Sequence, residues 1–454
     1  MRVIIYGAGE IGYGIAAYLA AEENDVVVID ESADRIAYVT ETLDVQGLVG
    51  RGSFPDVLEK ANAHKGDLLI AVTPVDEFNM MACQVASVFK IPTKIAHIRS
   101  SHYLNSTSQH IYTNQQVPVD FIISPEIEVA RSIVDTFYTP GAISLISLKL
   151  GSLKVVGLYC QEKCPLLNRP LSELRDYLGI TFQILCIMRA GFPVIPEPDD
   201  TLHCNDEIYL VVEKGSLLRL LSAFGYYSYP LETVVIIGAG KVGCALAQVI
   251  AERHPDLNVK LIEKNQEQAR YAAQVLEKAT VLHGEALDAQ FLRESNVSST
   301  DRVICVTNSD EVNVLSALLA KHLKAKHVTA LVNNRTYPSF LPSLGINSII
   351  TPSSITLSHI LRRVYERNLQ SLAVLQGGFF TILEHTIGPD SSLIGEKFRI
   401  FNVARHSLVG GVVRRDTFMI PPTQDFIQAG DHVILMVMRD SISSMENLLG
   451  GGVL

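Results

Sequence analysis

Residues 2–12 read R-V-I-I-Y-G-A-G-E-I-G, and residues 233–243 read T-V-V-I-I-G-A-G-K-V-G. Each stretch is a short apolar run followed by three glycines. The glycines are Gly7, Gly9 and Gly12 in the first copy and Gly238, Gly240 and Gly243 in the second. An apolar run that ends in glycines at this spacing predicts a buried strand, a tight loop and a helix. The repetition indicates that the chain contains two copies of one unit.

An acidic residue closes the next apolar run of each copy. Asp30 follows D-V-V-V-I and Glu263 follows V-K-L-I, close to the spacing of about 20 residues at which a carboxylate binds the ribose of a dinucleotide. The glycines let the backbone approach a pyrophosphate, and the helix N-terminus offers N–H groups to the phosphates. Because a carboxylate repels a 2′-phosphate, NADP is disfavoured. NAD(H), ATP and ADP remain alternatives.

The two halves stay similar beyond the glycine loops. V-T-P-V-D-E-F-N at 72–79 has the same spacing as V-T-N-S-D-E-V-N at 306–313. Strands and helices that alternate at this rhythm predict a parallel, doubly wound sheet. Thr73 and Thr307 end strands at the sheet edge where open α/β folds bind ligands. We expect Asp76 and Asp310 to be the N-caps of the helices that follow.

A β-rich segment of a different character follows each unit, with I-L-C-I-M-R-A-G-F-P-V-I-P at 184–196 and S-L-V-G-G-V-V-R-R-D-T-F-M-I-P at 407–421. The predicted class is therefore α/β, with two Rossmann-like doubly wound parallel-sheet domains, each followed by a small α+β domain. The expected boundaries are 1–123, 140–226, 232–350 and 368–454. Amphipathic helices from Glu126 and Ser354 lead out of the large domains. Their apolar faces suit either contact between the halves or packing within one half.

Composition narrows the classes of partner. The net charge is −10, and the sequence shows no stripe of clustered Lys and Arg. We therefore do not expect nucleic acid as a partner, and anionic lipid would be repelled. The sequence has no stretch of about 18 apolar residues that is free of charges and of the loop glycines, so we predict no membrane-spanning helix. The seven cysteines are scattered. The Cys160–Cys164 pair lacks the spacing of a zinc knuckle or a redox C-x-x-C, so we expect reduced, buried cysteines and a cytosolic protein.

The candidate nucleotide-binding residues lie around the two loops. They are Gly7, Ala8, Gly9, Glu10, Ile11, Gly12, Asp30, Thr73, Pro74 and Arg99 in the first half, and Gly238, Ala239, Gly240, Lys241, Val242, Gly243, Glu263 and Thr307 in the second. Arg99 is a candidate phosphate contact, and its counterpart is Asn333. We expect the first loop to hold the dinucleotide more firmly. It remains open whether the second loop, with Lys241 in place of Glu10, is a scaffold without ligand.

These motifs resemble the TrkA family, the peripheral nucleotide-binding subunits of Trk potassium uptake systems, which carry tandem regulator-of-potassium-conductance (RCK) domains. The resemblance covers nearly the whole chain. Besides the glycine loops and acids, it rests on V-T-P-V-D-E-F-N, H-I-R (97–99) and I-S-P-E (123–126), and on V-T-N-S-D-E-V-N, H-G-E-A (283–286) and I-T-P-S (350–353). One departure is R-G-S-F (51–54), where the second half keeps Gly284-Glu285. An acidic ligand contact is lost there, and Arg51 is expected to favour phosphate.

The resemblance implies a cytoplasmic subunit, peripheral on the inner membrane, that gates a potassium-translocating membrane protein. It implies binding of NAD(H) or adenine nucleotides, and a homo-oligomer that is a dimer or a tetrameric ring. The alternative is an NAD-dependent dehydrogenase, which would need a proton donor such as a histidine held by a carboxylate. His97 is the best candidate among the 13 histidines. No Ser-x-x-x-Lys, Cys–His or metal-ligand cluster stands out, so we predict no enzyme, no catalytic residue and no metal site.

Overall fold

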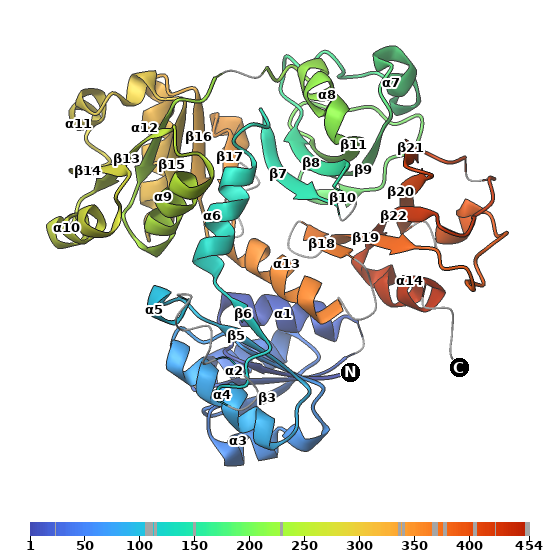
Figure 1. The fold of residues 1–454 in the computed structure, drawn as a ribbon, viewed down its shortest axis with the longest axis horizontal. Coiled ribbons are helices and arrows are strands. Elements are labelled where there is room, and N and C mark those ends of the chain that lie inside the picture. Colours follow the sequence, from blue (N-terminus) through green and yellow to red (C-terminus); the bar gives the residue numbers. More distant parts are fainter. Residues whose placement is uncertain are drawn as a thin grey trace. The chain divides into compact units, whose positions relative to one another are not determined.

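The computed structural model describes residues 1–22, 24–104, 112, 116–148, 151–227, 230–334, 337, 341–365, 371–375, 379–402, 406–422 and 424–449. Of the expected fourth domain, residues 368–370, 376–378, 403–405, 423 and 450–454 lie outside the described residues. Figure 1 shows two parallel-sheet domains and two smaller antiparallel ones. The α-helices are α1 Glu10–Ala20, α2 Ala33–Thr42, α3 Pro55–Lys60, α4 Asp76–Val88, α5 Ser101–Leu104, α6 Pro125–Asp135, α7 Leu171–Leu178, α8 Leu217–Ala223, α9 Lys241–Arg253, α10 Gln266–Val275, α11 Ala289–Glu294, α12 Asp310–His322, α13 Pro352–Tyr365 and α14 Ile442–Leu449.

Each large domain holds a six-stranded parallel sheet. The strand orders, β3-β2-β1-β4-β5-β6 and β14-β13-β12-β15-β16-β17, are the same doubly wound order. The strands are β1 Arg2–Tyr6, β2 Asp25–Asp30, β3 Gln46–Val49, β4 Leu68–Ala71, β5 Thr93–His97 and β6 Phe121–Ile123, and then β12 Thr233–Ile237, β13 Asn258–Glu263, β14 Ala279–His283, β15 Arg302–Cys305, β16 His327–Leu331 and β17 Ser348–Ile350. The predicted parallel, duplicated architecture is confirmed.

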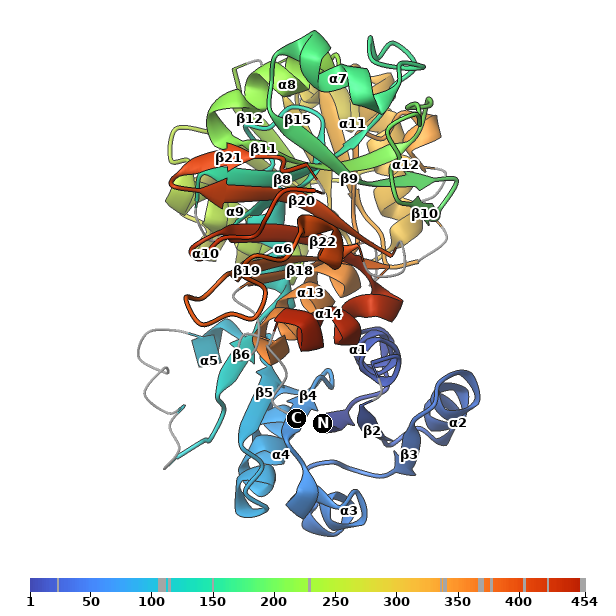
Figure 2. The same cartoon turned by 90° about the vertical axis from the view of Figure 1, so that its right-hand side faces the viewer.

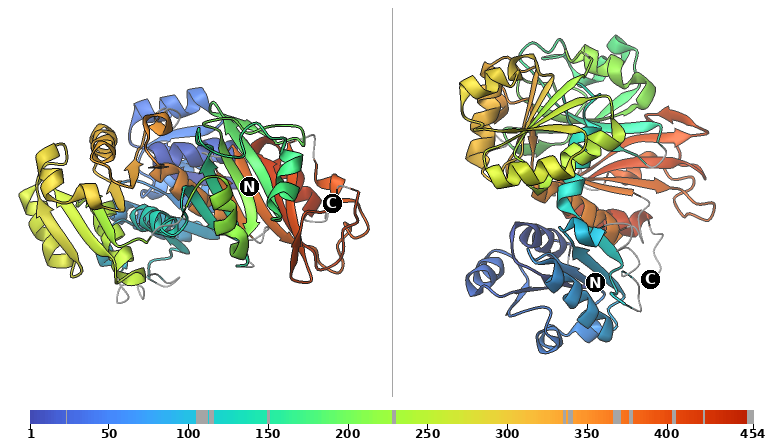
Figure 3. Two further views of the ribbon diagram at one scale, coloured as in Figure 1. Left: turned by 90° about the horizontal axis from the view of Figure 1, so that it is seen from above. Right: turned by 60° about the vertical axis from the view of Figure 1, so that its left-hand side comes forward.

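The apolar runs form these strands because both faces of a parallel sheet are covered. All four residues of β4 and all four of β15 are buried. Helices lie on both faces of each large sheet, as the yellow domain in Figure 3 shows. The central strand of each sheet, β1 or β12, ends at a glycine loop, and the strand order reverses beside it. Such a switch point is where doubly wound sheets bind ligands.

Each small domain holds a five-stranded sheet. The orders are β10-β9-β11-β8-β7 and β18-β19-β22-β20-β21, so the second reads as the first in reverse. The strands are β7 Ala142–Ser147, β8 Leu153–Tyr159, β9 Phe182–Arg189, β10 Phe192–Val194 and β11 Glu207–Glu213, and then β18 Ser371–Leu375, β19 Phe380–Thr386, β20 Ser407–Arg414, β21 Thr417–Met419 and β22 His432–Met438. In Figure 2, β9 and β20 lie side by side. A Cβ on Gly410 of β20 would meet Leu185 Cδ2 at 2.5 Å, so glycine permits this close approach.

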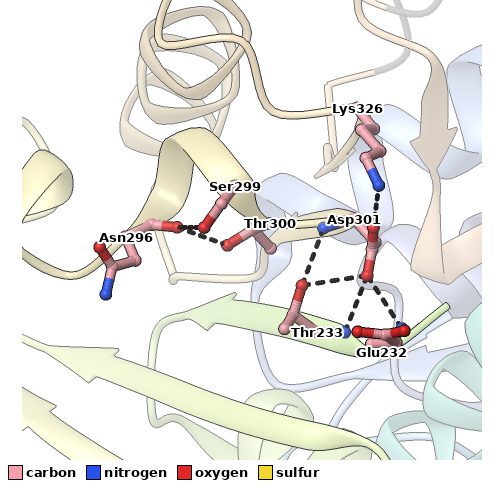
Figure 4. Close-up of polar contacts among 7 residues, drawn as sticks. All are labelled: Glu232, Thr233, Asn296, Ser299, Thr300, Asp301 and Lys326. Atoms are coloured by element: carbon pink, nitrogen blue, oxygen red, sulfur yellow. Dashed lines mark hydrogen bonds and ion pairs between the residues drawn. The ribbon is translucent and has the colours of Figure 1, made fainter.

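A buried carboxylate anchors the second large sheet at the edge opposite the glycine loop (Figure 4). Asp301 accepts hydrogen bonds from the backbone N–H of Glu232 and Thr233, each at 2.9 Å, and from the Thr233 hydroxyl at 3.0 Å. Lys326 Nζ lies 2.6 Å from Asp301 Oδ1. Burial raises the pKa of Asp301, but the Lys326 and backbone donors outweigh it and lower this pKa to about 2. The carboxylate thus ties the start of β12 to the loop before β15.

The chain separates into two compact units that exchange helices. One unit comprises Met1–Pro125, Ser353–Ile382 and Val437–Leu454, and the other comprises Glu126–Pro352 and Leu383–Met436. Helix α6 follows the first large sheet in sequence, but all of it except Pro125 belongs to the unit that holds the second sheet. Helix α13 follows the second sheet, but all of it except Pro352 belongs to the unit that holds the first. The sequence left open which half these helices contact, and the structure assigns each to the other half.

Side-chain contacts within each unit fix these helices. Arg302 of β15 is 3% exposed, and its guanidinium donates to the carbonyls of Thr136 at 2.9 Å and Phe137 at 3.0 Å, just past the end of α6. Arg253, at the end of α9, forms an ion pair with Asp135 at 2.7 Å. In the other unit, the guanidinium of Arg363 on α13 lies over the Phe121 ring, 5.1 Å from its centroid.

Two further findings concern the described part of the chain. None of its helices combines the length and the apolar character needed to cross a bilayer. Its His, Cys, Asp and Glu side chains form no group of three or more arranged to hold a metal ion.

Candidate functional site: two glycine loops

The first glycine loop joins β1 to α1. Gly7 has a φ of +114°, which favours glycine, and its N–H donates to the Ile29 carbonyl at 2.8 Å. A Cβ on Gly12 would lie 1.8 Å from the Gly7 oxygen, so α1 packs on the loop as closely as its backbone permits. A Cβ on Gly9, the N-cap of α1, would meet nothing within 4 Å. The space beside Gly9 is therefore open for a phosphate at the helix N-terminus.

Asp30, at the end of β2, holds this loop from the side. Its side chain accepts the Ala8 N–H at 2.7 Å on one oxygen and the Ser32 N–H at 2.9 Å on the other. The Arg35 guanidinium on α2 lies 3.8 Å from Asp30 Oδ2 and is more than half exposed. A carboxylate has about four lone-pair sites, so two backbone donors leave acceptor capacity for ribose hydroxyls.

The second loop, between β12 and α9, repeats this geometry. Gly238 has a φ of +106°, and a Cβ on Gly243 would lie 1.9 Å from the Gly238 oxygen. Glu263, at the end of β13, accepts the Ala239 N–H at 2.8 Å and the Asn265 N–H at 2.9 Å. One difference lies at the Ala239 carbonyl, which accepts Gln268 Nε2 at 2.5 Å and the Cys244 thiol at 3.3 Å.

Two buried asparagines organise the strand ends beside the loops. Asn79 is fully buried. Its Oδ1 accepts the Thr73 N–H at 3.0 Å and lies 2.7 Å from the Thr73 hydroxyl. Its Nδ2 donates to the carbonyls of Thr73 and His97. Asn313 makes the same set of bonds to Thr307 and Leu331. The hydroxyl groups of both threonines are therefore hydrogen-bonded within the protein, next to the glycine loop.

The expectation that Asp76 and Asp310 are N-caps is wrong. The N-caps are Val75 and Ser309, and each aspartate is the first helical residue. Asp76 instead accepts the backbone N–H of Arg99 at 2.9 Å and of Ser100 at 2.8 Å. Asp310 accepts the N–H of Asn333 at 2.9 Å and of Asn334 at 2.8 Å. The carboxylates shape the loop after the neighbouring strand because that loop lies within reach of the helix start.

The remaining candidates lie around the rims of the two loops. Glu10 and Lys241 are exposed at the first position of α1 and α9, Ile11 and Val242 are half-buried beside them, and Pro74 is exposed after β4. Arg51, expected to favour phosphate, forms an ion pair with Glu31 at 2.9 Å. Its guanidinium also lies over the Phe78 and Phe54 rings, 5.2 and 5.7 Å from their centroids. His97, the candidate proton donor of a dehydrogenase, is 5% exposed on β5.

Sequence reasoning missed four residues near the loops: Arg35, Asn79, Gln268 and Asn313. The asparagines carried a signal, because both stand at the same place in the repeated V-T-x-x-D-E-x-N spacing. Arg35 and Gln268 carried none in sequence. They occupy equivalent positions, because each donates its backbone N–H to the side-chain oxygen of the helix N-cap, Ser32 or Asn265.

The fold and the loops define a class of protein with two Rossmann-like domains, each followed by a small antiparallel domain. Each Rossmann-like domain carries a glycine loop of the type that binds nucleotides. The TrkA-N domain model matches residues 3–125 and 234–352, which are the two large domains.

Curated relatives match along the full length. The Trk system potassium uptake protein TrkA of Azorhizobium caulinodans is 37% identical over 450 residues, covering 99% of this chain and 98% of that protein. The protein of the same name from Halomonas elongata is 33% identical over 458 residues, covering 100% of this chain and 99% of that protein. The chain therefore belongs to the TrkA family, which confirms the resemblance found in the sequence.

Solved structures show the same fold. A crystal structure of the GsuK RCK domain aligns with a TM-score of 0.62 at 16% identity, covering 99% of this chain and 95% of that chain. A structure of the GsuK channel bound to NAD aligns with a TM-score of 0.62 at 18% identity, covering 98% of this chain and 78% of that chain. These likenesses show that the chain shares the fold of those structures.

Proposed function

We propose that this chain is the regulatory subunit of a Trk-type potassium uptake system, and that it binds NAD(H), or ATP or ADP, at the glycine loops without converting the nucleotide. The observation that carries the proposal is the first loop. It has an open approach at Gly9, a helix N-terminus behind it, and a buried carboxylate, Asp30, beside it. The full-length TrkA relatives, named for potassium uptake, supply the process.

The residues present fit a dinucleotide. The pyrophosphate would lie against the backbone of Gly7, Ala8 and Gly9 at the start of α1, with Glu10 and Ile11 in its first turn. Asp30 would accept the ribose hydroxyls. Thr73, Pro74 and Arg99, on the neighbouring loops, would flank the ligand. We propose that this first loop holds the nucleotide more firmly than the second.

The second loop has the equivalent parts. Gly238, Ala239 and Gly240 would contact the phosphates, Lys241 and Val242 open α9, and Glu263 would bind ribose. The proposal that this loop binds less firmly is supported by the Ala239 carbonyl, which Gln268 and Cys244 already hold.

Gating requires a partner and an assembly. We propose that the chain forms a homo-oligomer, a dimer or a tetrameric ring, and lies on the cytoplasmic face of the inner membrane through a potassium-translocating subunit. Nucleotide shifts the equilibrium between arrangements of the assembly by its difference in affinity for them. The net charge of −10 supports a protein rather than lipid as the membrane contact.

Calorimetry on the purified chain with NADH, NAD, ATP and ADP tests the site, and potassium flux through the reconstituted membrane subunit tests the role. Replacing Asp30 with alanine is expected to weaken binding at the first loop about 10-fold or more, because a ribose hydrogen bond to a charged acceptor is worth about 1.5–3 kcal/mol. Unchanged binding would reject the assigned site. Oxidation of NADH with a small substrate, and no effect on flux, would instead support a dehydrogenase.

A further inference from the structure

Two side chains at the start of α4 hold the loop that follows β5. Asp76 accepts the backbone N–H of Arg99 at 2.9 Å and of Ser100 at 2.8 Å. Asn79 Nδ2 donates to the His97 carbonyl at 2.8 Å. Asp76 is 7% exposed and Asn79 is fully buried. Because residues three apart lie on one face of a helix, a single face of α4 fixes the backbone that carries the half-buried Arg99 side chain.

The same hydrogen bonds reach the first glycine loop. Asn79 Oδ1 accepts the Thr73 N–H at 3.0 Å, just after β4. A Cβ on Gly7 would lie 3.1 Å from the Thr73 N, so the backbone of the glycine loop lies directly against Thr73. The strands β1, β4 and β5 are neighbours in the sheet, and ligands of such sheets bind outside the carboxyl ends of the strands. Arg99 is thus tied through Asn79 and Thr73 to the edge at which the phosphates are proposed to bind.

The second large domain repeats this arrangement with a neutral side chain in place of Arg99. Asp310 accepts the backbone N–H of Asn333 at 2.9 Å and of Asn334 at 2.8 Å. The Asn333 side chain itself donates to Asp310 Oδ1 at 3.1 Å, so it is bound to the carboxylate that holds its backbone. The loop therefore forms without an arginine, and of the two halves only the first has a cation at this position.

We propose that Asp76 is a positioning residue of the first loop: by fixing the backbone of Arg99, it holds the guanidinium toward the phosphates of the bound nucleotide. The inference rests on the proposed function, in which this loop binds NAD(H) or an adenine nucleotide. A guanidinium donates from a rigid, planar fork, so its contribution to binding depends on its orientation. The charge of Asp76 by itself repels an anionic ligand. A gain in affinity from Asp76 therefore comes through the group that it holds.

Titration calorimetry with NADH on the full-length protein tests this role. Every variant carries Gly240→Ala, whose Cβ would occupy the open space beside the second loop, 3.8 Å from Asn308 Oδ1, so that only the first loop is measured. Arg99→Ala is expected to bind NADH about 10-fold or more weakly, because a charge-assisted hydrogen bond is lost. Asp76→Asn is expected to bind about 3- to 10-fold more weakly, because one carboxylate oxygen becomes an NH2 group that faces an N–H donor.

The sign of the Asp76→Asn effect separates positioning from charge. Removing a negative charge alone would strengthen the binding of an anion, so weaker binding indicates positioning. Glu77→Gln removes the same charge at the next residue, which is exposed, and is expected to leave the affinity unchanged or slightly higher. Asp310→Asn makes the matched change in the second half and should leave the affinity of the first loop unchanged. Equal or tighter binding by Asp76→Asn would overturn the proposal.

A double variant shows whether Asp76 acts through Arg99. The combination of Asp76→Asn with Arg99→Ala is expected to bind NADH within about 2-fold of Arg99→Ala alone, whereas losses that multiply would contradict the proposal. If Asp76→Asn lowers the Tm too far for binding to be measured, Asp76→Ser, which keeps an acceptor for one N–H, takes its place. Undiminished binding by Arg99→Ala would reject this inference alone. A Gly240→Ala reference protein that binds none of NADH, NAD, ATP and ADP would reject the proposed function, and this inference with it.

Discussion

Two alanine substitutions in the first glycine loop separate ligand approach from loop packing. At Gly9 the φ of −70° suits alanine, and the added Cβ would meet nothing within 4 Å. Alanine at an N-cap costs about 0.5–1 kcal/mol relative to glycine, and the stiffer unfolded chain returns about 0.4–1 kcal/mol. The free energy of unfolding should therefore change by less than about 0.5 kcal/mol. The methyl group would instead occupy the space in which we propose that the pyrophosphate binds.

Gly12→Ala is expected to behave in the opposite way. Its Cβ would lie 1.8 Å from the Gly7 oxygen, so α1 or the loop must move. Overpacking of this kind costs about 3 kcal/mol or more, which lowers the Tm of the first large domain by about 6–12 °C at 2–4 °C per kcal/mol. Both variants should lose affinity, but only Gly12→Ala should lose stability.

Titration calorimetry with NADH and differential scanning calorimetry of the free protein check both expectations. A steric cost of about 1–3 kcal/mol at Gly9 corresponds to binding about 5- to 150-fold weaker. The measurement is made in a Gly240→Ala background to silence the second loop, where the added Cβ would also lie in open space, 3.8 Å from Asn308 Oδ1. Wild-type affinity in Gly9→Ala, or an unchanged Tm in Gly12→Ala, would refute the reasoning.

Three further substitutions test the contacts that hold the large domains. Because the pKa of Asp301 is lowered in the folded state, its charge stabilises the fold above about pH 4 and loses this effect as pH falls toward 2. In urea unfolding, the free energy of unfolding of Asp301→Asn should lie about 1–2 kcal/mol below that of the wild type, and this difference should close over that pH range. A difference that stays constant with pH would contradict this. Asn79→Ala should cost about 3 kcal/mol, because several buried partners lose their bonds, whereas the exposed Asn308→Ala should change little; equal thermal shifts would count against the assignment. In thermal unfolding, Arg302→Met should destabilise the protein by about 2–3 kcal/mol, because two carbonyls past α6 lose their donor. The control Arg253→Met, at an exposed residue, should cost less than about 0.5 kcal/mol. The reverse order would show that Arg302 does not hold α6.

The sequence was sufficient for features set by local chemistry. The glycine spacings predicted both loops because a positive φ at Gly7 and the backbone contact at Gly12 tolerate no other residue. The alternation of strands and helices predicted the parallel sheets, whose strands β4 and β15 are buried throughout. The repeated motifs also identified the TrkA family. The acids Asp30 and Glu263 could be placed at strand ends, but their bonds to Ala8 and Ala239 could not be foreseen.

The candidate site was less predictable wherever a side chain serves a distant segment. Asp76 reads in sequence as an N-cap, yet its carboxylate holds the loop at Arg99 and Ser100. Asn79 reads as one polar residue of a helix, yet it joins the ends of two strands. In each case the partner is chosen by the packing of elements, which residue spacing does not encode.

The amino-acid sequence alone therefore determined the duplicated domains, the glycine loops and the family, because strand, turn and helix preferences act over a few neighbouring residues. Only the tertiary structure decided where the amphipathic helices α6 and α13 pack. Their apolar faces would be satisfied by any suitable surface, and the choice follows from long-range contacts such as that of Arg302 with the carbonyls past α6. Each of these helices lies mainly in the compact unit that holds the other large sheet.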